Sequence, residues 1–122
     1  MNRQYRGARN YLAGVSAENS VAATYRRLGY TITAQRWRGS RGEVDLIAYN
    51  KETVVFIEVK KGPTHELAAT RLTQPQIARL FATATEFAAS EPAGQMTPMR
   101  FDLATVDRLG TVEIRENAFM TA

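Results

Sequence analysis

The chain contains no cysteine, only one histidine and only one tryptophan among its 122 residues. Without cysteine it can form neither a disulfide nor a thiolate metal site, which excludes zinc fingers and disulfide-stapled folds. No apolar run approaches the ~20 residues that span a bilayer, and the start MNRQYRGARNYLAG lacks the apolar core of a secretory signal. We therefore expect a cytoplasmic protein without a membrane segment.

Acidic residues are scarce in the first third of the chain. Up to Arg41 there are eight arginines and the single acid Glu18, whereas the remainder holds eight basic and eleven acidic residues. Thirteen of the sixteen cations are arginine, whose planar fork binds phosphate oxygens in pairs. This asymmetry favours a polyanionic partner, although a solvated basic surface without any partner explains the charge about equally well.

Length and composition, with 44% hydrophobic and 23% charged residues, are those of one globular domain over residues 1–122. We expect residues 1–9 to form a flexible basic tail. Apolar spacing predicts helices over 10–28 and 74–90, and β-branched and aromatic residues predict strands over 30–37, 43–49, 53–60, 100–106 and 110–119. This order, α-β-β-β-α-β-β, predicts an α/β fold with a mixed sheet flanked by helices, whose first three strands form an antiparallel meander.

The second and third of these strands carry charges where a buried strand would carry apolar residues. Side chains alternate along a strand, so the odd-numbered residues of 43–47 share one face and the even-numbered residues of 44–48 share the other. A turn centred between residues 51 and 52 pairs positions whose numbers sum to 103. Asp45 is therefore expected to oppose Glu58.

Two opposed carboxylates repel each other unless a cation lies between them. Mg²⁺ suits this position because it takes oxygen ligands, usually one or two carboxylates with waters and substrate phosphates. Lys60 would lie beside such an ion, where it could orient a water or stabilise charge on a phosphate. The alternative is a solvent-exposed face on which Glu43 pairs with Lys60, and the residues alone do not decide between the two.

Glu18 lies on the apolar stripe of the first predicted helix, three residues after Val15 and four before Ala22. A buried carboxylate without a partner is costly, so we expect Glu18 to point inward and to join the charged cluster of the hairpin. The alternative is a position at the edge of the stripe, facing solvent.

Asp45, followed across a hairpin turn by Glu58-Val59-Lys60, resembles the active-site signature of the restriction-endonuclease-like, PD-(D/E)-x-K nuclease superfamily. More narrowly, the segments GEVDLIA, FIEVK, RFDLATV and ENAF, with AEN at residues 17–19, resemble the YraN-type family of small bacterial proteins along nearly the whole chain. That family is similar to archaeal Holliday-junction resolvases, which implies a glutamate on the first helix, here Glu18. The chain departs from these patterns in having valine where the superfamily name has proline, at position 44, and glycine in place of an arginine at position 62.

The resemblance implies a divalent-metal-dependent endonuclease that hydrolyses DNA, with branched or flapped DNA as candidate substrates. Mg²⁺ or Mn²⁺ would be held by Asp45, Glu58, the backbone carbonyl of Val59 and Glu18, and Lys60 would position the attacking water. The residues expected to bind the DNA backbone are Arg36, Arg38, Arg41 and Lys61. A homodimer would suit a resolvase, because a four-way junction needs two cuts. The alternatives are a non-catalytic nucleic-acid-binding protein that retains the nuclease fold, and an interaction domain without nucleic acid.

For four further residues a structural role is favoured over a functional one. Gln76 matches a polar position that nuclease relatives use near the metal, but a helix-surface role is favoured. Trp37 could stack on a base, although a tryptophan at a strand end more often belongs to the core. His65 is expected to be a loop histidine without a specific role, and Asp102 is expected to be structural.

Overall fold

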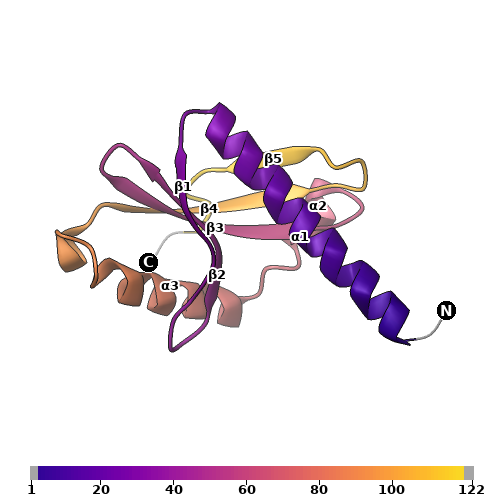
Figure 1. The fold of residues 1–122 in the computed structure, drawn as a ribbon, viewed down its shortest axis with the longest axis horizontal. Helices are drawn as coiled ribbons and strands as arrows, with labels where there is room; N and C mark the ends of the chain where they lie inside the picture. Colours follow the sequence, from indigo (N-terminus) through magenta and orange to yellow (C-terminus); the bar gives the residue numbers. More distant parts are fainter. Residues whose placement is uncertain (1–2, 120–122) are drawn as a thin grey trace.

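A computed structural model describes the backbone of residues 3–119 and the side chains of residues 14–119. It contains one sheet with helices on both faces (Figure 1). In chain order the elements are α1 (Arg3–Arg27), β1 (Thr31–Arg38), β2 (Glu43–Asn50), β3 (Thr53–Lys61), α2 (His65–Ala69), α3 (Gln74–Ala88), a 3₁₀ turn η1 (Gly94–Met96), β4 (Met99–Val106) and β5 (Val112–Arg115).

The five strands lie in the order in which they occur in the chain, β1-β2-β3-β4-β5. The first three form the predicted antiparallel meander, β4 pairs in parallel with β3, and β5 returns antiparallel to β4. The prediction of a mixed sheet flanked by helices is therefore confirmed. The β2–β3 pairs, from Asn50 with Thr53 to Leu46 with Ile57, also keep the predicted register.

Two apolar clusters, one on each face of the sheet, hold the layers together. On one face Val21 and Tyr25 of α1 pack against Leu46 and Ile57 of the sheet, in a cluster of fully or nearly fully buried residues. On the other face α3 packs against β2 and β3, and the ring of its Phe87 meets that of Phe56 edge to face at 5.7 Å. Neighbouring positions of β3 alternate between these two clusters, as expected for a strand that is buried on both faces.

Two helical segments differ from the sequence-based expectation. The first helix begins at Arg3 rather than at residue 10, so residues 3–9 belong to it instead of forming a separate tail. Residues 1–2 of the predicted tail lie outside the described part. The segment after Pro63, expected to be a loop, contains α2, whose first turn is capped by the Thr64 hydroxyl accepting from the backbone N–H of Leu67 at 3.1 Å.

Asp102 of β4 ties the sheet to α1 and to the segment after β5. It is fully buried, and its carboxylate accepts hydrogen bonds from the Tyr25 hydroxyl at 2.7 Å, from the Arg100 guanidinium at 2.8 and 2.9 Å, and from the backbone N–H of Asn117 at 3.0 Å. This arrangement is a buried ion pair whose carboxylate is fully hydrogen-bonded, so the structural role expected for Asp102 is the one that the structure gives it.

Within residues 3–119, no helix has both the length and the apolar character needed to cross a membrane.

Candidate functional site

The acidic residues of the hairpin lie where β2 and β3 stop pairing. The ladder between the two strands ends at Leu46 with Ile57, and Asp45 and Glu58 are the next residues outward. Instead of continuing the ladder, the Asp45 carboxylate accepts a hydrogen bond from the backbone N–H of Val59 at 2.8 Å. The Asp45 side chain thus takes the place of a backbone acceptor on β2. This hydrogen bond fixes the Asp45 carboxylate next to the backbone of Glu58 and Val59.

Burial and neighbouring negative charges raise the pKa of both carboxyl groups. Burial, with the negative charge of Asp45 as the next cause, raises the pKa of Glu58 to about 8, and Lys60 only partly offsets this rise. Burial also raises the pKa of Asp45 to about 6; the hydrogen bond from Val59 opposes this rise, and the negative charge of Glu18 adds to it. Near neutral pH the pair therefore retains a proton, which a cation between the two groups would displace.

These groups open into a pocket of about 270 Å³ between the sheet and α3, which we call the carboxylate pocket. Its lining residues are Gly42, Glu43, Asp45, Glu58, Val59, Lys60, Gln76, Arg79 and Leu80. Lys60 is only 18% exposed at its side chain, and its Nζ lies 4.0 Å from Oε2 of Glu58. The pocket thus brings together three of the four predicted catalytic residues, and α3 adds polar groups from its first turns.

Glu18, the fourth predicted residue, is buried as expected but has a partner that the sequence did not indicate. Its Oε2 accepts from Nε of Arg36 at 2.7 Å. Glu18 is close enough to raise the pKa of Asp45, yet it does not line the carboxylate pocket. It would have to rearrange relative to Arg36 before it could contribute to a metal site.

The predicted alternation fails at this end of β2. Val44 packs in the α3-side cluster together with Ile47, whereas strict alternation had placed Val44 on the opposite face. On the neighbouring strand β1, Arg36 has a left-handed backbone with φ of 52°, and the β1–β2 pairs on either side of it are Gln35 with Leu46 and Trp37 with Val44.

Glu43 also differs from the expectation. Its Oε2 lies 3.3 Å from Nη2 of Arg38 on the neighbouring strand, so the predicted pairing of Glu43 with Lys60 is not formed. The reason is that β2 and β3 have already separated at this point, which leaves β1 as the neighbour of Glu43. The Glu43–Lys60 pair on which the alternative to a metal site rested is therefore absent, and these two residues lie beside Arg38 and Glu58 instead.

The donor set has the chemistry of a hard-cation site, although it is small. Within the described residues, no three Asp, Glu, His or Cys side chains form a group that could hold a metal ion. Mg²⁺ needs fewer protein ligands than that, because it keeps several waters and is often held by one or two carboxylates with substrate phosphates. The paired oxygens of Asp45 and Glu58 fit this requirement, and burial raises the pKa of both groups.

Of the residues predicted to bind DNA, three are accessible. Arg41 and Lys61 are exposed, and the Arg38 side chain is 81% exposed. Arg36 is engaged by Glu18. The neighbouring Trp37 packs edge to face on Phe87, with ring centroids 5.3 Å apart, which makes it part of the α3-side core and not a free stacking platform.

Gln76 has two roles that the sequence did not separate. It lines the carboxylate pocket, and its side-chain oxygen also accepts from the backbone N–H of Thr73, while the Thr73 hydroxyl accepts from the backbone N–H of Gln76. This reciprocal pair is a capping box at the start of α3. The helix-surface interpretation is therefore correct, and the position beside the carboxylates is additional to it.

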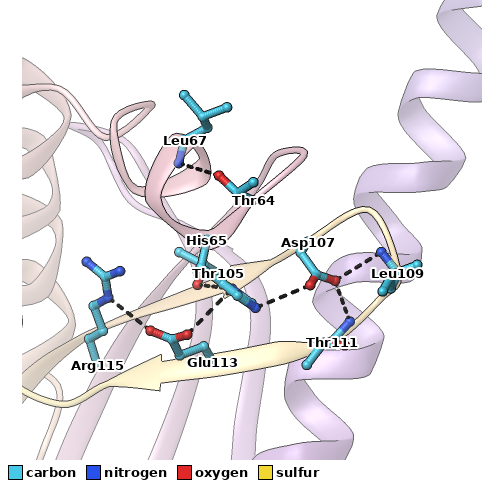
Figure 2. Close-up of polar contacts among 9 residues, drawn as sticks. All are labelled: Thr64, His65, Leu67, Thr105, Asp107, Leu109, Thr111, Glu113 and Arg115. Carbon is cyan, nitrogen blue, oxygen red and sulfur yellow. Dashed lines mark hydrogen bonds and ion pairs between the residues drawn. The ribbon is translucent and has the colours of Figure 1, made fainter.

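His65 is not the uninvolved loop residue that we expected. It begins α2, and its Nδ1 lies 2.7 Å from the Thr105 hydroxyl, while Nε2 lies 3.6 Å from Oδ2 of Asp107 (Figure 2). The order hydroxyl, imidazole, carboxylate resembles a nucleophile with its base, but Thr105 is fully buried and cannot reach a substrate. The contact instead fastens α2 to the end of β4, and no sequence spacing could have indicated it because His65 lies forty residues before Thr105.

Comparison with known proteins gives the family. A model described as "Uncharacterised protein family UPF0102" matches residues 17–106. A UPF0102 protein from Ruegeria pomeroyi is 55% identical over 114 residues, covering 93% of each chain, and one from Cereibacter sphaeroides is 53% identical over 113 residues, covering 93% of this chain and 97% of the relative. A more distant relative from Dinoroseobacter shibae is 42% identical over 118 residues, covering 97% of this chain and 88% of the relative. The chain therefore belongs to the UPF0102 family, the YraN-type family that its motifs resemble.

Proposed function

We propose that this protein is a divalent-metal-dependent endonuclease that hydrolyses phosphodiester bonds in DNA. The observation that carries the proposal is the carboxylate pocket, in which Asp45 and Glu58 are held together with raised pKa values beside Lys60. A strongly perturbed pair of acids in a cleft with a cationic neighbour is typical of a functional site. Burying two carboxyl groups side by side costs folding free energy. A bound cation and a phosphate would offset that cost.

Asp45 and Glu58 would hold Mg²⁺ or Mn²⁺, with the backbone carbonyl of Val59 as a further oxygen ligand. When bound, the ion would stabilise the negative charge that develops on the scissile phosphate. The Val59 N–H keeps the Asp45 carboxylate in place at 2.8 Å, so this ligand is positioned before any ion arrives. Glu18 would join the site after exchanging its contact with Arg36.

Lys60 would orient the attacking water and stabilise the phosphate. In hydrolysis the water oxygen forms a bond to phosphorus and one ester P–O bond breaks, so negative charge accumulates on the phosphoryl oxygens. An ammonium group that is mostly buried, 4.0 Å from Glu58, is well placed to attract both the water and that charge. Arg79, which lines the same pocket from α3, offers a second cation to the DNA strand.

The fold is consistent with the proposal. A helix followed by an antiparallel meander, then a helix and a strand parallel to β3, is the order that the resemblance to restriction-endonuclease-like nucleases implies. Such a core puts the acidic residues of the hairpin at an open end of the sheet, and here they lie where β2 and β3 separate. Branched or flapped DNA remains the proposed substrate class, and the basic residues of β1 and the following turn would contact its backbone without reading sequence.

One observation favours a second function, a nucleic-acid-binding protein without turnover. Glu18 is paired with Arg36 at 2.7 Å and does not line the carboxylate pocket, and Glu43, which lines it beside Asp45 and Glu58, is paired with Arg38. A protein with this arrangement could bind DNA through its arginines and leave the phosphodiester bond intact.

The test is incubation with linear, flapped and four-way DNA in Mg²⁺ or Mn²⁺, with cleavage followed on denaturing gels. We expect the wild type to cleave at least one substrate and Lys60→Ala to lose about 10²-fold or more in rate, since one group that stabilises charge in the transition state contributes about this much. Mn²⁺ should also raise the melting temperature of the wild type and of Lys60→Ala, but not that of Asp45→Ala.

The rival function gives the opposite pattern. DNA would be bound with equal affinity by the wild type, Asp45→Ala and Glu58→Ala, no substrate would be cut in either metal, and Mn²⁺ would leave the melting temperature of all three unchanged. That combination would remove the proposal of catalysis and leave only binding.

A further inference from the structure

The turn between β1 and β2 is fastened to α3 by one acidic side chain. The turn comprises Gly39, Ser40, Arg41 and Gly42, which we call the basic turn, and it is closed by the Gly39 N–H donating to the Gly42 carbonyl at 2.9 Å. Glu86 of α3 accepts three hydrogen bonds from Ser40, two from its backbone N–H at 2.9 and 3.1 Å and one from its hydroxyl at 2.9 Å. Both carboxylate oxygens of Glu86 are used to hold a single residue.

The two glycines allow the turn to lie directly on the helix. A Cβ at Gly39 would lie 2.6 Å from Oε2 of Glu86, and a Cβ at Gly42 would lie 3.1 Å from the Thr83 hydroxyl. Neither glycine has a positive φ, so these positions need glycine for space and not for backbone conformation. The turn is therefore packed on α3 at both ends, with Glu86 as its polar clamp.

The clamped turn is continuous with the carboxylate pocket. Gly42 lines that pocket and would place a Cβ 3.6 Å from the Cβ of Arg79. Arg41, one residue earlier, lines an adjoining hollow of about 600 Å³ together with Glu86. Within residues 14–119, neither Arg41 nor Arg79 forms an ion pair, so both guanidinium groups are available to an anion.

We propose that Glu86 is a positioning residue for nucleic-acid binding, which presents Arg41 to a DNA phosphate beside the carboxylate pocket by clamping the basic turn on α3. This inference rests on the proposed function, because it takes DNA as the ligand of the surface. A flexible turn of glycine, serine and arginine would lose conformational entropy whenever Arg41 bound a phosphate. The three bonds from Ser40 to Glu86 fix the turn before DNA arrives, which lowers that cost.

The proposal and simple electrostatics predict opposite changes in DNA affinity when the charge of Glu86 is removed. Glu86 is an acid on a surface that would face a polyanion, so removing its charge should strengthen DNA binding if the residue did nothing else. If Glu86 acts through the turn, removing its charge should weaken binding instead. Its contacts with Ser40 are exposed, so their loss should leave the fold intact.

The experiment measures the affinity of a fluorescein-labelled four-way DNA junction, and of a linear duplex, by anisotropy in EDTA and low salt, so that no cleavage occurs. The variants are Glu86→Gln, Arg41→Ala and the double variant, with Glu52→Gln in the β2–β3 turn as a charge-matched control. We expect Glu86→Gln to weaken binding about threefold to tenfold, the size of one or two lost hydrogen bonds. Glu52→Gln should bind as the wild type does or slightly tighter, and Glu86→Gln should add nothing in the Arg41→Ala background.

The inference fails if Glu86→Gln binds as tightly as Glu52→Gln, or if its effect persists in the Arg41→Ala background. Ser40→Ala removes only the hydroxyl contact and should weaken binding less than Glu86→Gln does. It replaces Glu86→Gln in the test if that variant has a lowered melting temperature. Absence of any DNA binding by the wild type would overturn the proposed function together with this inference. Normal binding by the wild type with no effect of Glu86→Gln would overturn this inference alone.

Discussion

Asp45 and Glu58 form a buried pair of acids that destabilises the folded protein as the pH rises. In the folded chain the pKa of Glu58 is raised from 4.5 to about 8, mainly by burial and by the charge of Asp45. The folded state therefore holds a proton that the unfolded chain releases at lower pH. Stability must fall as pH rises from about 4.5 through about 8, because over that range the unfolded state binds fewer protons.

Glu58→Gln should remove most of this pH dependence. A neutral amide in place of the acid leaves Asp45 without its like-charged neighbour, so the variant should be more stable than the wild type by roughly 2–4 kcal/mol at pH 9. At pH 5 the two proteins should be nearly equal. Guanidinium unfolding in EDTA at pH 5, 7 and 9 measures this difference, with Glu52→Gln as a control that should follow the wild type. Parallel pH profiles for the wild type and Glu58→Gln would contradict the raised pKa.

Sequence reasoning found the pocket residues because their pattern is local. Asp45, Glu58 and Lys60 lie on one hairpin, so alternation and a turn position are enough to bring them together. The ion pair of Glu18 with Arg36 could not be found in this way, because it depends on a left-handed residue within β1. A positive φ in a non-glycine residue leaves no signal in the sequence.

At the scale of elements, α2 determines which residue can occupy position 62. Gly62 follows β3 and its N–H donates to the Val106 carbonyl at 3.1 Å. A Cβ at this position would lie 2.8 Å from the backbone nitrogen of Ala68 in α2 and 2.9 Å from its Cα. The resemblance implies an arginine at position 62. This chain has glycine there, at the point where the backbone of α2 leaves no room for a side chain.

Gly62→Ala should therefore destabilise the protein by about 1–3 kcal/mol, the cost of forcing a methyl group into a packed site. The obstacle is backbone, which cannot rotate away, so α2 itself has to shift. Thermal and denaturant unfolding measure the loss. Gly14→Ala is the matched substitution, since nothing lies within 4 Å of a Cβ there, and on α1 it should be neutral or stabilising by up to about 1 kcal/mol. Equal stability of the two variants would show that α2 does not pack on Gly62 in solution.

The predicted strands agree with the structure to within a residue or two over β1 to β4, because alternating or continuous apolar runs bounded by turn residues indicate them directly. The second predicted strand, Glu43–Tyr49, is β2 at Glu43–Asn50. The five-residue α2 was missed since one and a half turns are too short to show a helical period. Its stability comes from the Thr64 cap and from tertiary contacts such as that of His65 with Thr105.

At the scale of the whole molecule, the positive charge is concentrated in one part of the chain. The net charge is +4, with the excess of cations confined to the residues up to Arg41. Arg79 lines the carboxylate pocket from α3, Arg38 is paired with Glu43 of its lining, and Arg41 lines the hollow beside Glu86. Cations grouped around one pocket attract a polyanion far more effectively than the same charge spread evenly.

DNA affinity should consequently fall steeply with salt. For three phosphate contacts the plot of log K against log salt concentration should have a slope of about −3, and Arg41→Ala should reduce its magnitude by about one. Arg108→Ala, which removes an exposed arginine on the β4–β5 turn outside the pocket, should leave the slope unchanged. Anisotropy titrations between 50 and 200 mM KCl, a range over which such slopes are resolved, provide the measurement. A slope near zero would mean that phosphates are not the ligands of this surface.

The sheet ends at β1 on one side and at β5 on the other. β5 offers four residues of free edge with Glu113 and Arg115 along it, and the backbone of β1 turns left-handed at Arg36. Short, charged or interrupted borders give an incoming strand few backbone partners. Copies of the folded chain therefore gain little by joining sheet to sheet, which protects a crowded solution from fibrous growth. A pair of subunits able to cut both sides of a junction would have to meet through helical or loop surfaces.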